Sequence, residues 1–210
     1  MGKIYNMDLK NKIVEVAGYL FTKYGVRSIT MDDIARELSV SKKTIYQHFK
    51  DKDEIVNVAT QAHLEQEKKE FDDIYSKSAN AIEELALISQ CMKKNIIDLN
   101  PSLLYDLNKY HRKAWEGFLE FKDDFVKNQI KRNLERGVKE KYYRKEIAPD
   151  VLAICRMEQI QMAFDDKIFL KRDFDFKQIQ MQLFDLFVYG IVTEKGKQLY
   201  HEYLKKHTTN

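Results

Sequence analysis

Hydrophobic residues recur at helical spacing from one end of the chain to the other. Near the start, Ile13, Ala17 and Phe21 stand at i, i+4 and i+8 and form one stripe. This stripe predicts a helix from about residue 8 to residue 24. Gly25 follows directly and is placed to end that helix, because glycine adopts the left-handed conformation that many helix ends require.

Three helix-capping signals follow within about twenty residues. Thr30 is placed to cap a second helix, and Asp33, three residues on, can return the bond to the Thr30 amide. Ser41 caps a third helix, expected from Lys42 to about Phe49, after a turn of only a few residues. Asp51 caps a fourth helix, with Glu54 at the reciprocal position. A capping residue therefore marks the start of each of these three predicted helices.

The remaining apolar stripes predict helices to the end of the chain. They run from 82 to 96, from Pro101 onward, from 115 to a stop at Gly137, from Pro149 to 164, from Asp175 to Gly190, and from a cap at Thr193. Residues 142–146 are expected to form a loop. The sequence therefore predicts an all-α fold, with a three-helix head at residues 1–52 and a helical domain at residues 53–210.

Composition excludes several classes of protein. The 210 residues carry a net charge of only +3, and 44% are hydrophobic, which is typical of a globular protein. No apolar run approaches the roughly 18 residues of a membrane span, and the start lacks a signal-peptide core, so we expect a cytoplasmic protein without membrane contact. Cys91 and Cys155 are isolated, which favours reduced thiols, and we expect no metal or cofactor.

The third helix separates an apolar face from a polar face. On a helical wheel, Ile45 and Phe49 lie together, and Lys43 and Gln47 point the opposite way with Thr44. Two short helices joined by a tight turn and backed by a third form a helix-turn-helix. Such a polar face fits the major groove, where lysine can donate to guanine and glutamine can pair with adenine. Taken alone, the same face also fits a solvated surface helix.

Residues 12–58 resemble the DNA-binding domain of the TetR (AcrR-like) family of bacterial transcriptional regulators. The matching stretch, read from Ala17, is AxxLFxKYGVRSITMDDIARELSVSKKTIYQHFKDKDEIV. It combines the step from Gly25 to Thr30 with the turn and the YxHFxxKxE run, and it covers about a quarter of the chain. The resemblance implies a sequence-specific DNA-binding regulator, commonly a ligand-responsive repressor that binds a palindromic operator as a homodimer.

The resemblance also assigns roles by position. Base contacts are implied for Lys42 and Lys43, although relatives often carry a smaller residue at position 43, and Gln47 contacts either bases or the backbone. Phosphate contacts are implied for the other matched positions, which are Thr30, Thr44, Tyr46, His48 and Lys52. The bare amides at the start of the second helix add a further phosphate site.

The rest of the chain is expected to hold the dimer interface and a ligand pocket. Relatives dimerise through two long helices, here about 149–170 and 174–192. About half of their apolar residues should be buried within the subunit and half across the interface, although plain core packing fits all of them: Ile154, Met157, Ile160, Met162, Leu183, Phe184, Phe187 and Tyr189. A small hydrophobic or aromatic effector is expected among the central helices, with candidate contacts at Tyr105, Tyr110, Trp115 and Phe118. An aromatic stripe at helical spacing also fits plain core packing.

Three other functions remain open or disfavoured at this level. An enzyme is disfavoured because the sequence contains no GxSxG, P-loop, HExxH or paired ExxH motif. A regulator controlled by a partner protein or by its own abundance, rather than by a small molecule, fits the sequence equally well. An architectural DNA binder without sequence preference is distinguished by competition with random DNA at fixed salt.

Overall fold

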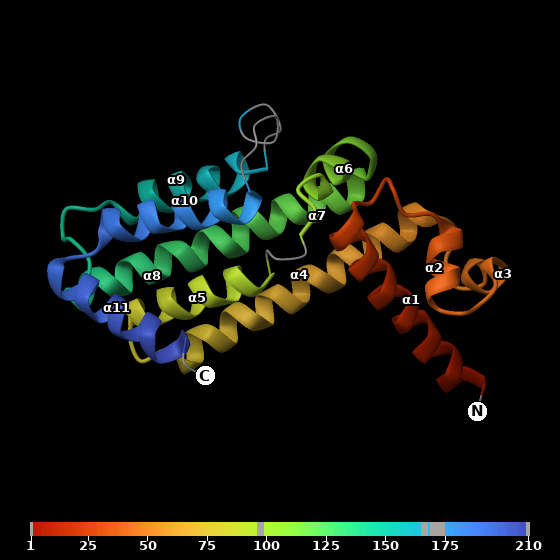
Figure 1. The fold of residues 1–210 in the computed structure, drawn as a ribbon, viewed down its shortest axis with the longest axis horizontal. Helices are drawn as coiled ribbons and strands as arrows, with labels where there is room; N and C mark the ends of the chain where they lie inside the picture. Colours follow the sequence, from red (N-terminus) through yellow and green to blue (C-terminus); the bar gives the residue numbers. More distant parts are fainter. Residues whose placement is uncertain (1, 96–98, 165–167, 169–174, 209–210) are drawn as a thin grey trace. The chain divides into compact units, whose positions relative to one another are not determined.

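The computed structural model describes residues 2–95, 99–164, 168 and 175–208, which form helices joined by short turns (Figure 1). In these residues the only extended pairing is one antiparallel bridge between Tyr143 and Val192. The prediction of an all-α fold is therefore confirmed. None of the described helices is long and apolar enough to cross a membrane.

The chain divides into two compact units. Unit 1 comprises residues 1–67 and 98–120, and unit 2 comprises residues 68–97 and 121–210. The predicted division at residue 52 concerns function rather than compactness, so it stays a prediction.

Unit 1 contains the N-terminal helices and two short helices from the middle of the chain. Its elements are α1 (Gly2–Tyr24), α2 (Met31–Glu37), α3 (Lys42–Tyr46), the first part of α4 (Lys52–Lys77), α6 (Leu103–Tyr110) and α7 (Arg112–Glu120).

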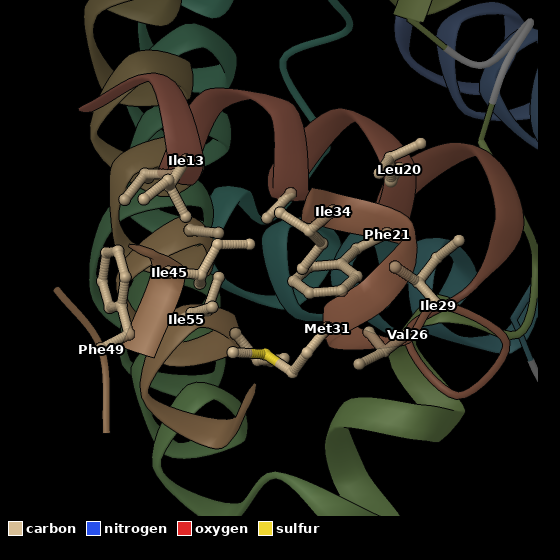
Figure 2. Packing of buried hydrophobic residues seen from close by; sticks show 14 of the residues in the cluster. Ile13, Leu20, Phe21, Val26, Ile29, Met31, Ile34, Ile45, Phe49 and Ile55 are labelled. Atoms are coloured by element: carbon tan, nitrogen blue, oxygen red, sulfur yellow. The ribbon is translucent and has the colours of Figure 1, made fainter. Parts of the chain in front are cut away.

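The core of unit 1 is built by side chains from each of its first four helices (Figure 2). Ile13, Ile34, Ile45 and Ile55 come from α1, α2, α3 and α4 in turn, and all four are wholly buried. Burial of one such side chain contributes about 1.5–3 kcal/mol. A helix as short as α3 is not stable alone in water, so this packing is what holds it in place.

Gly25 ends α1, as predicted from the sequence. Its φ of 81° lies in the left-handed region, and its amide donates to the Phe21 carbonyl at 3.0 Å. A Cβ atom at this position would also approach the Ser102 Oγ to 2.9 Å. The backbone conformation and the close packing therefore both favour glycine here.

Unit 2 contains the end of α4 and the C-terminal helices. Its other elements are α5 (Ala81–Asn95), a π-helical segment η1 (Phe121–Val126), α8 (Lys127–Lys139), α9 (Pro149–Met162), α10 (Phe176–Ile191) and α11 (Glu194–Thr208). Its core combines residues of α5, α8, α9, α10 and α11. The predicted cap at Thr193 is present, since its hydroxyl accepts from the Gly196 amide. Asp175, at the predicted start of α10, also caps its helix by accepting from the Gln178 amide.

Two predicted helix boundaries in unit 2 are wrong. The expected single helix ending at Gly137 consists of α7, η1 and α8, and α8 continues to Lys139. Gly137 is needed for packing instead, because a Cβ there would overlap the ring of Tyr143. Lys141, with a φ of 62°, provides the left-handed residue beyond the helix end. Similarly, α10 passes through Gly190 and ends at Ile191.

Candidate nucleic-acid interface

The starts of α2 and α3 are each fixed by local hydrogen bonds. At the start of α2, the Asp33 amide donates to Thr30 Oγ1 at 3.2 Å, and the Thr30 amide donates to Asp33 Oδ2 at 2.9 Å. The Thr30 hydroxyl also donates to Asp33 Oδ2 at 2.6 Å, and this bond, together with the one from the Thr30 amide, lowers the pKa of the Asp33 carboxyl. At the start of α3, the Thr44 amide donates to Ser41 Oγ at 3.0 Å. Both predicted caps are therefore confirmed.

The surface of α3 separates as the helical wheel predicts. Ile45 and Phe49 are buried, whereas Lys43 and Gln47 are exposed and Tyr46 is 48% exposed. The α-helix is shorter than predicted and ends at Tyr46, but backbone hydrogen bonds to the Ile45 carbonyl continue through residues 48 and 49. The donors of the predicted DNA-reading face thus project away from the core. Thr44 and His48 are partly buried at its edges.

Lys42 already has an anionic partner on α2. Its Nζ lies 2.7 Å from Asp32 Oδ2, and the hydrogen bond from Lys42 to Asp32 raises the pKa of the lysine. Both groups are exposed, so the pair is weak and open to competition from another anion. Sequence reasoning missed this partner, because ten residues and a turn separate the two side chains.

Lys52 is placed differently from the other predicted DNA-binding residues. Its ammonium donates to the Val26 carbonyl at 2.6 Å, and the side chain is partly buried. Burial lowers the pKa of Lys52, while the charge of Asp106 acts in the opposite direction. The structure therefore shows Lys52 fastening the turn after α1 to the start of α4.

The first turn of α4 carries two features beyond the predicted cap. Asp51 accepts a hydrogen bond from the Glu54 amide, as expected. The Glu54 carboxylate accepts in turn from the Lys50 amide at 2.7 Å, rather than from the Asp51 amide. His111 Nδ1 lies 2.7 Å from Asp53 Oδ1 and connects the α6–α7 junction to this turn. No local sequence signal points to the pair, since 58 residues separate its members.

Of the four predicted pocket residues, two are exposed and two are partly buried. Tyr105 and Tyr110 are exposed on α6, and Lys109 donates to the Tyr105 hydroxyl at 2.8 Å. Trp115 and Phe118 stack with ring centroids 5.3 Å apart, and Trp115 packs against the core of unit 1. The surface position of both tyrosines does not support a pocket lining. The predicted effector contacts gain no support from this arrangement.

The predicted interface residues divide between the core and the surface. Phe184, Phe187 and Met157 are buried within unit 2. Ile160, Met162 and Leu183 are partly buried, whereas Ile154 and Tyr189 are exposed. Positions 165–167, 169 and 170 of the first predicted interface helix and position 174 of the second lie outside the described residues, as does position 96 of an earlier predicted helix.

Sequence comparison identifies similar proteins over this region and beyond it. The family model "Bacterial regulatory proteins, tetR family" matches residues 13–59. The HTH-type transcriptional regulator YvaF of Bacillus subtilis is 28% identical over 171 residues, or 80% of this chain and 88% of that protein. The HTH-type transcriptional repressor KstR2 of Mycobacterium tuberculosis is 24% identical over 146 residues, or 68% of this chain and 73% of that protein.

Solved structures share the fold. A transcriptional regulator from Saccharomonospora viridis, solved in complex with choline, superimposes with a TM-score of 0.70 at 20% identity, covering 90% of this chain and all of that one. The family-model match at residues 13–59 contains α2, the turn and α3. It therefore coincides with the part of unit 1 that presents the exposed donors.

Proposed function

The chain belongs to the TetR family of bacterial regulatory proteins, and we propose that it acts as a dimeric repressor that releases its operator when a small molecule binds. It is a helix-turn-helix transcriptional regulator, as its relatives are. The observation that carries the DNA-binding role is the exposed donor face of α3, opposite the wholly buried Ile45.

In the proposed complex, α3 lies in the major groove of double-stranded DNA. Lys43 and Gln47 are placed to contact base edges, since they are exposed on the outer side of the helix. Tyr46 and His48 reach phosphates from the two flanks, and Lys42 does so after leaving Asp32. The amino terminus of α2, capped by Thr30, adds backbone amides for another phosphate.

The test is selection of bound sites from a random DNA pool with the purified protein. We expect a palindrome whose half-sites are about one DNA turn apart, because two recognition helices related by two-fold symmetry read equivalent bases. Gln47→Ala should lose part of the base preference within each half-site. A pool that shows no enriched sequence at moderate salt would contradict specific recognition and favour a phosphate-driven binder.

The proposed dimer forms through an apolar strip on the outer surface of α9 and α10. Val151, Ile154 and Cys155 are exposed at i, i+3 and i+4 on α9, and Leu186 and Tyr189 are exposed at i and i+3 on α10. Leu186 is 64% exposed and Ile154 is 55% exposed. Large apolar side chains gathered on one surface favour association.

Charge substitution in this strip tests the dimer. Ile154→Glu and Leu186→Glu should each give monomers in sedimentation at micromolar concentration, since an unpaired carboxylate cannot be buried in an apolar interface. Tyr105→Glu, a change at another exposed aromatic residue, is the matched control and should stay dimeric. Alkylation of Cys155 should be slow in the dimer and fast in the Leu186→Glu variant. Persistence of the dimer in both strip variants would place the interface elsewhere.

We propose repression, and its release by a small molecule, from what the names of two similar proteins state. KstR2 is named a transcriptional repressor, and the structurally similar regulator from Saccharomonospora viridis holds choline. We propose that the effector of this protein binds in unit 2 and acts through α4, which contributes residues to both units. A ligand with equal affinity for the DNA-bound and DNA-free forms would change nothing, so the effector must prefer the DNA-free form.

A further inference from the structure

Arg156 is a buried cation that pairs with no carboxylate in the part of the chain that the structure describes. Its side chain, on α9, is only 3% exposed, and burial lowers the pKa of its guanidinium to about 10. The guanidinium carbon lies 5.2 Å from the ring centroid of Phe184 and 5.7 Å from that of Phe187. Among the described residues no carboxylate pairs with it, and its Nη1 has no hydrogen-bond partner. A buried charge in this condition destabilises a fold.

Two glutamine side chains close to Arg156 in the helix register are also unsatisfied. Gln159 follows Arg156 by three residues on α9, and its buried Oε1 has no partner. Gln180 lies one turn before Phe184 on α10, is buried, and has an Oε1 without a partner. An amide can turn its NH2 group toward an acceptor, so either glutamine can act as a donor.

The register of α9 against α10 brings Gln180 toward Arg156. At one end of the pair, the Phe164 and Phe176 rings have centroids 4.8 Å apart. Further along, Arg156 lies over Phe184 and Phe187. The two helices therefore run antiparallel, and Gln180 falls between these two points of contact. Arg156 and Gln180 thus lie along one stretch of the α9–α10 contact, with Gln159 one turn from Arg156, and each has a buried polar atom that no described residue satisfies.

A second cation is buried on the neighbouring helical segment η1. Lys122 donates to Gln161 of α9 at 2.8 Å, and its nearest carboxylate, Asp123, is 3.7 Å away and mostly exposed. Gln161 lies about 140° around α9 from Arg156, so Lys122 marks a second buried cation against α9 and is separate from the Arg156 cluster. The aromatic rings beside Arg156 supply apolar surface directly next to the charge.

We propose that Arg156 is the anchor for an organic carboxylate with an apolar body, held between α9 and α10. A planar guanidinium binds a carboxylate through two parallel hydrogen bonds, which an unpaired Arg156 can offer. Gln159 and Gln180 donate to the remaining lone pairs, and Phe184 and Phe187 contact the hydrocarbon. The inference rests on the proposed function in one respect, namely that this carboxylate is the effector.

The first experiment compares Arg156→Met with wild type in the absence of ligand. Methionine keeps the length of the side chain and removes the charge, so we expect the Tm to rise by about 3 °C. Arg132→Met is the matched control, since Arg132 pairs with the buried Glu84 at 3.1 Å, and its Tm should fall. A fall in Tm for Arg156→Met comparable to that control would make Arg156 a structural residue and overturn the proposal.

The second experiment measures thermal shifts with octanoate, 4-phenylbutanoate, 1-octanol, octyltrimethylammonium and octyl phosphate. At least one carboxylate should raise the wild-type Tm saturably by about 3 °C and leave Arg156→Met unchanged. The alcohol and the ammonium compound should act equally on both proteins. Equal or absent responses to the carboxylates would overturn the site, and a response to octyl phosphate alone would overturn the choice of carboxylate.

DNA binding separates this inference from the proposed function. With the selected operator labelled for anisotropy, the active carboxylate should release wild-type protein and leave the Arg156→Met complex bound. A protein that shows the thermal shift but binds no DNA would refute the proposed regulator and leave the site standing. A thermal shift without release from the operator would refute the effector role alone.

Discussion

Replacing Lys52 with methionine distinguishes a structural role from a phosphate contact. The resemblance to other regulators implies that Lys52 contacts DNA, whereas its ammonium is bonded to the Val26 carbonyl at 2.6 Å and lies 5.9 Å from the Phe21 ring centroid. Methionine retains the packing of the aliphatic stem and removes only the charge. The substitution therefore isolates the bond between the start of α4 and the turn after α1.

The expected loss of stability is about 1 kcal/mol. A hydrogen bond to a charged group contributes about 1.5–3 kcal/mol when shielded from water. Because Lys52 is only partly buried, solvent screening reduces that contribution to roughly half or less. For a chain of this size, a change of about 1 kcal/mol lowers the Tm by about 3 °C.

The assay pairs thermal unfolding with operator binding at several salt concentrations. Each phosphate-bound lysine adds about 0.9 to the slope of log K against log salt. We expect Lys52→Met to lower the Tm, to weaken binding to all sequences modestly, and to leave the slope unchanged. Lys43→Met is the control, because Lys43 is exposed on α3 and its loss should change binding without changing the Tm. An unchanged Tm with a slope reduced by about 0.9 would refute the structural role.

Three further substitutions test other parts of the molecule. Asp32→Asn frees Lys42 and removes a negative charge close to the DNA, so operator affinity by anisotropy should rise about threefold; weaker binding would contradict this. Gln47→Ala should reduce discrimination at one base pair of each half-site by about tenfold in competition binding, and uniform weakening at all positions would make Gln47 a backbone contact. Gly137→Ala should lower the free energy of unfolding by about 2 kcal/mol in urea, because the new methyl overlaps the Tyr143 ring; a more stable variant would show that helix propensity outweighs the overlap.

Sequence reasoning succeeded where the determining interactions are local. The caps at Thr30, Ser41 and Thr193 each accept a hydrogen bond from the amide three residues ahead, so the residue type and its spacing carry the full signal. The burial of Ile45 and Phe49 follows from the wheel because only one face of α3 meets the core. In both cases the relevant partner lies within a few residues or on a predictable side.

The sequence does not predict features that depend on contacts between residues far apart along the chain. Gly137 was assigned as a helix stop because glycine usually ends helices, but here the ring of Tyr143 excludes a larger side chain. The sequence also gives no signal that the Lys52 ammonium donates to the Val26 carbonyl, which belongs to a turn 26 residues earlier, and its phosphate contact stays a prediction. For α10, the apolar spacing in the sequence does not distinguish Phe187, which is buried, from Leu186, which is exposed. Only the packing of α9 and α5 against α10 settles which side of the helix faces inward.

The burial pattern of unit 1 also limits how an effector can act. The isoleucines of α1, α2, α3 and α4 form one core, and the caps of α2 and α3 are made by side chains of the protein itself. The donors of α3 are therefore in place before binding, and an effector cannot work by folding or unfolding α3 at small cost. In the proposed dimer, the effector would therefore act by changing the spacing of the two recognition helices, because the operator half-sites fix that spacing. Amide exchange in α3 should accordingly be the same with and without effector, and a loss of protection there on ligand binding would refute this mechanism.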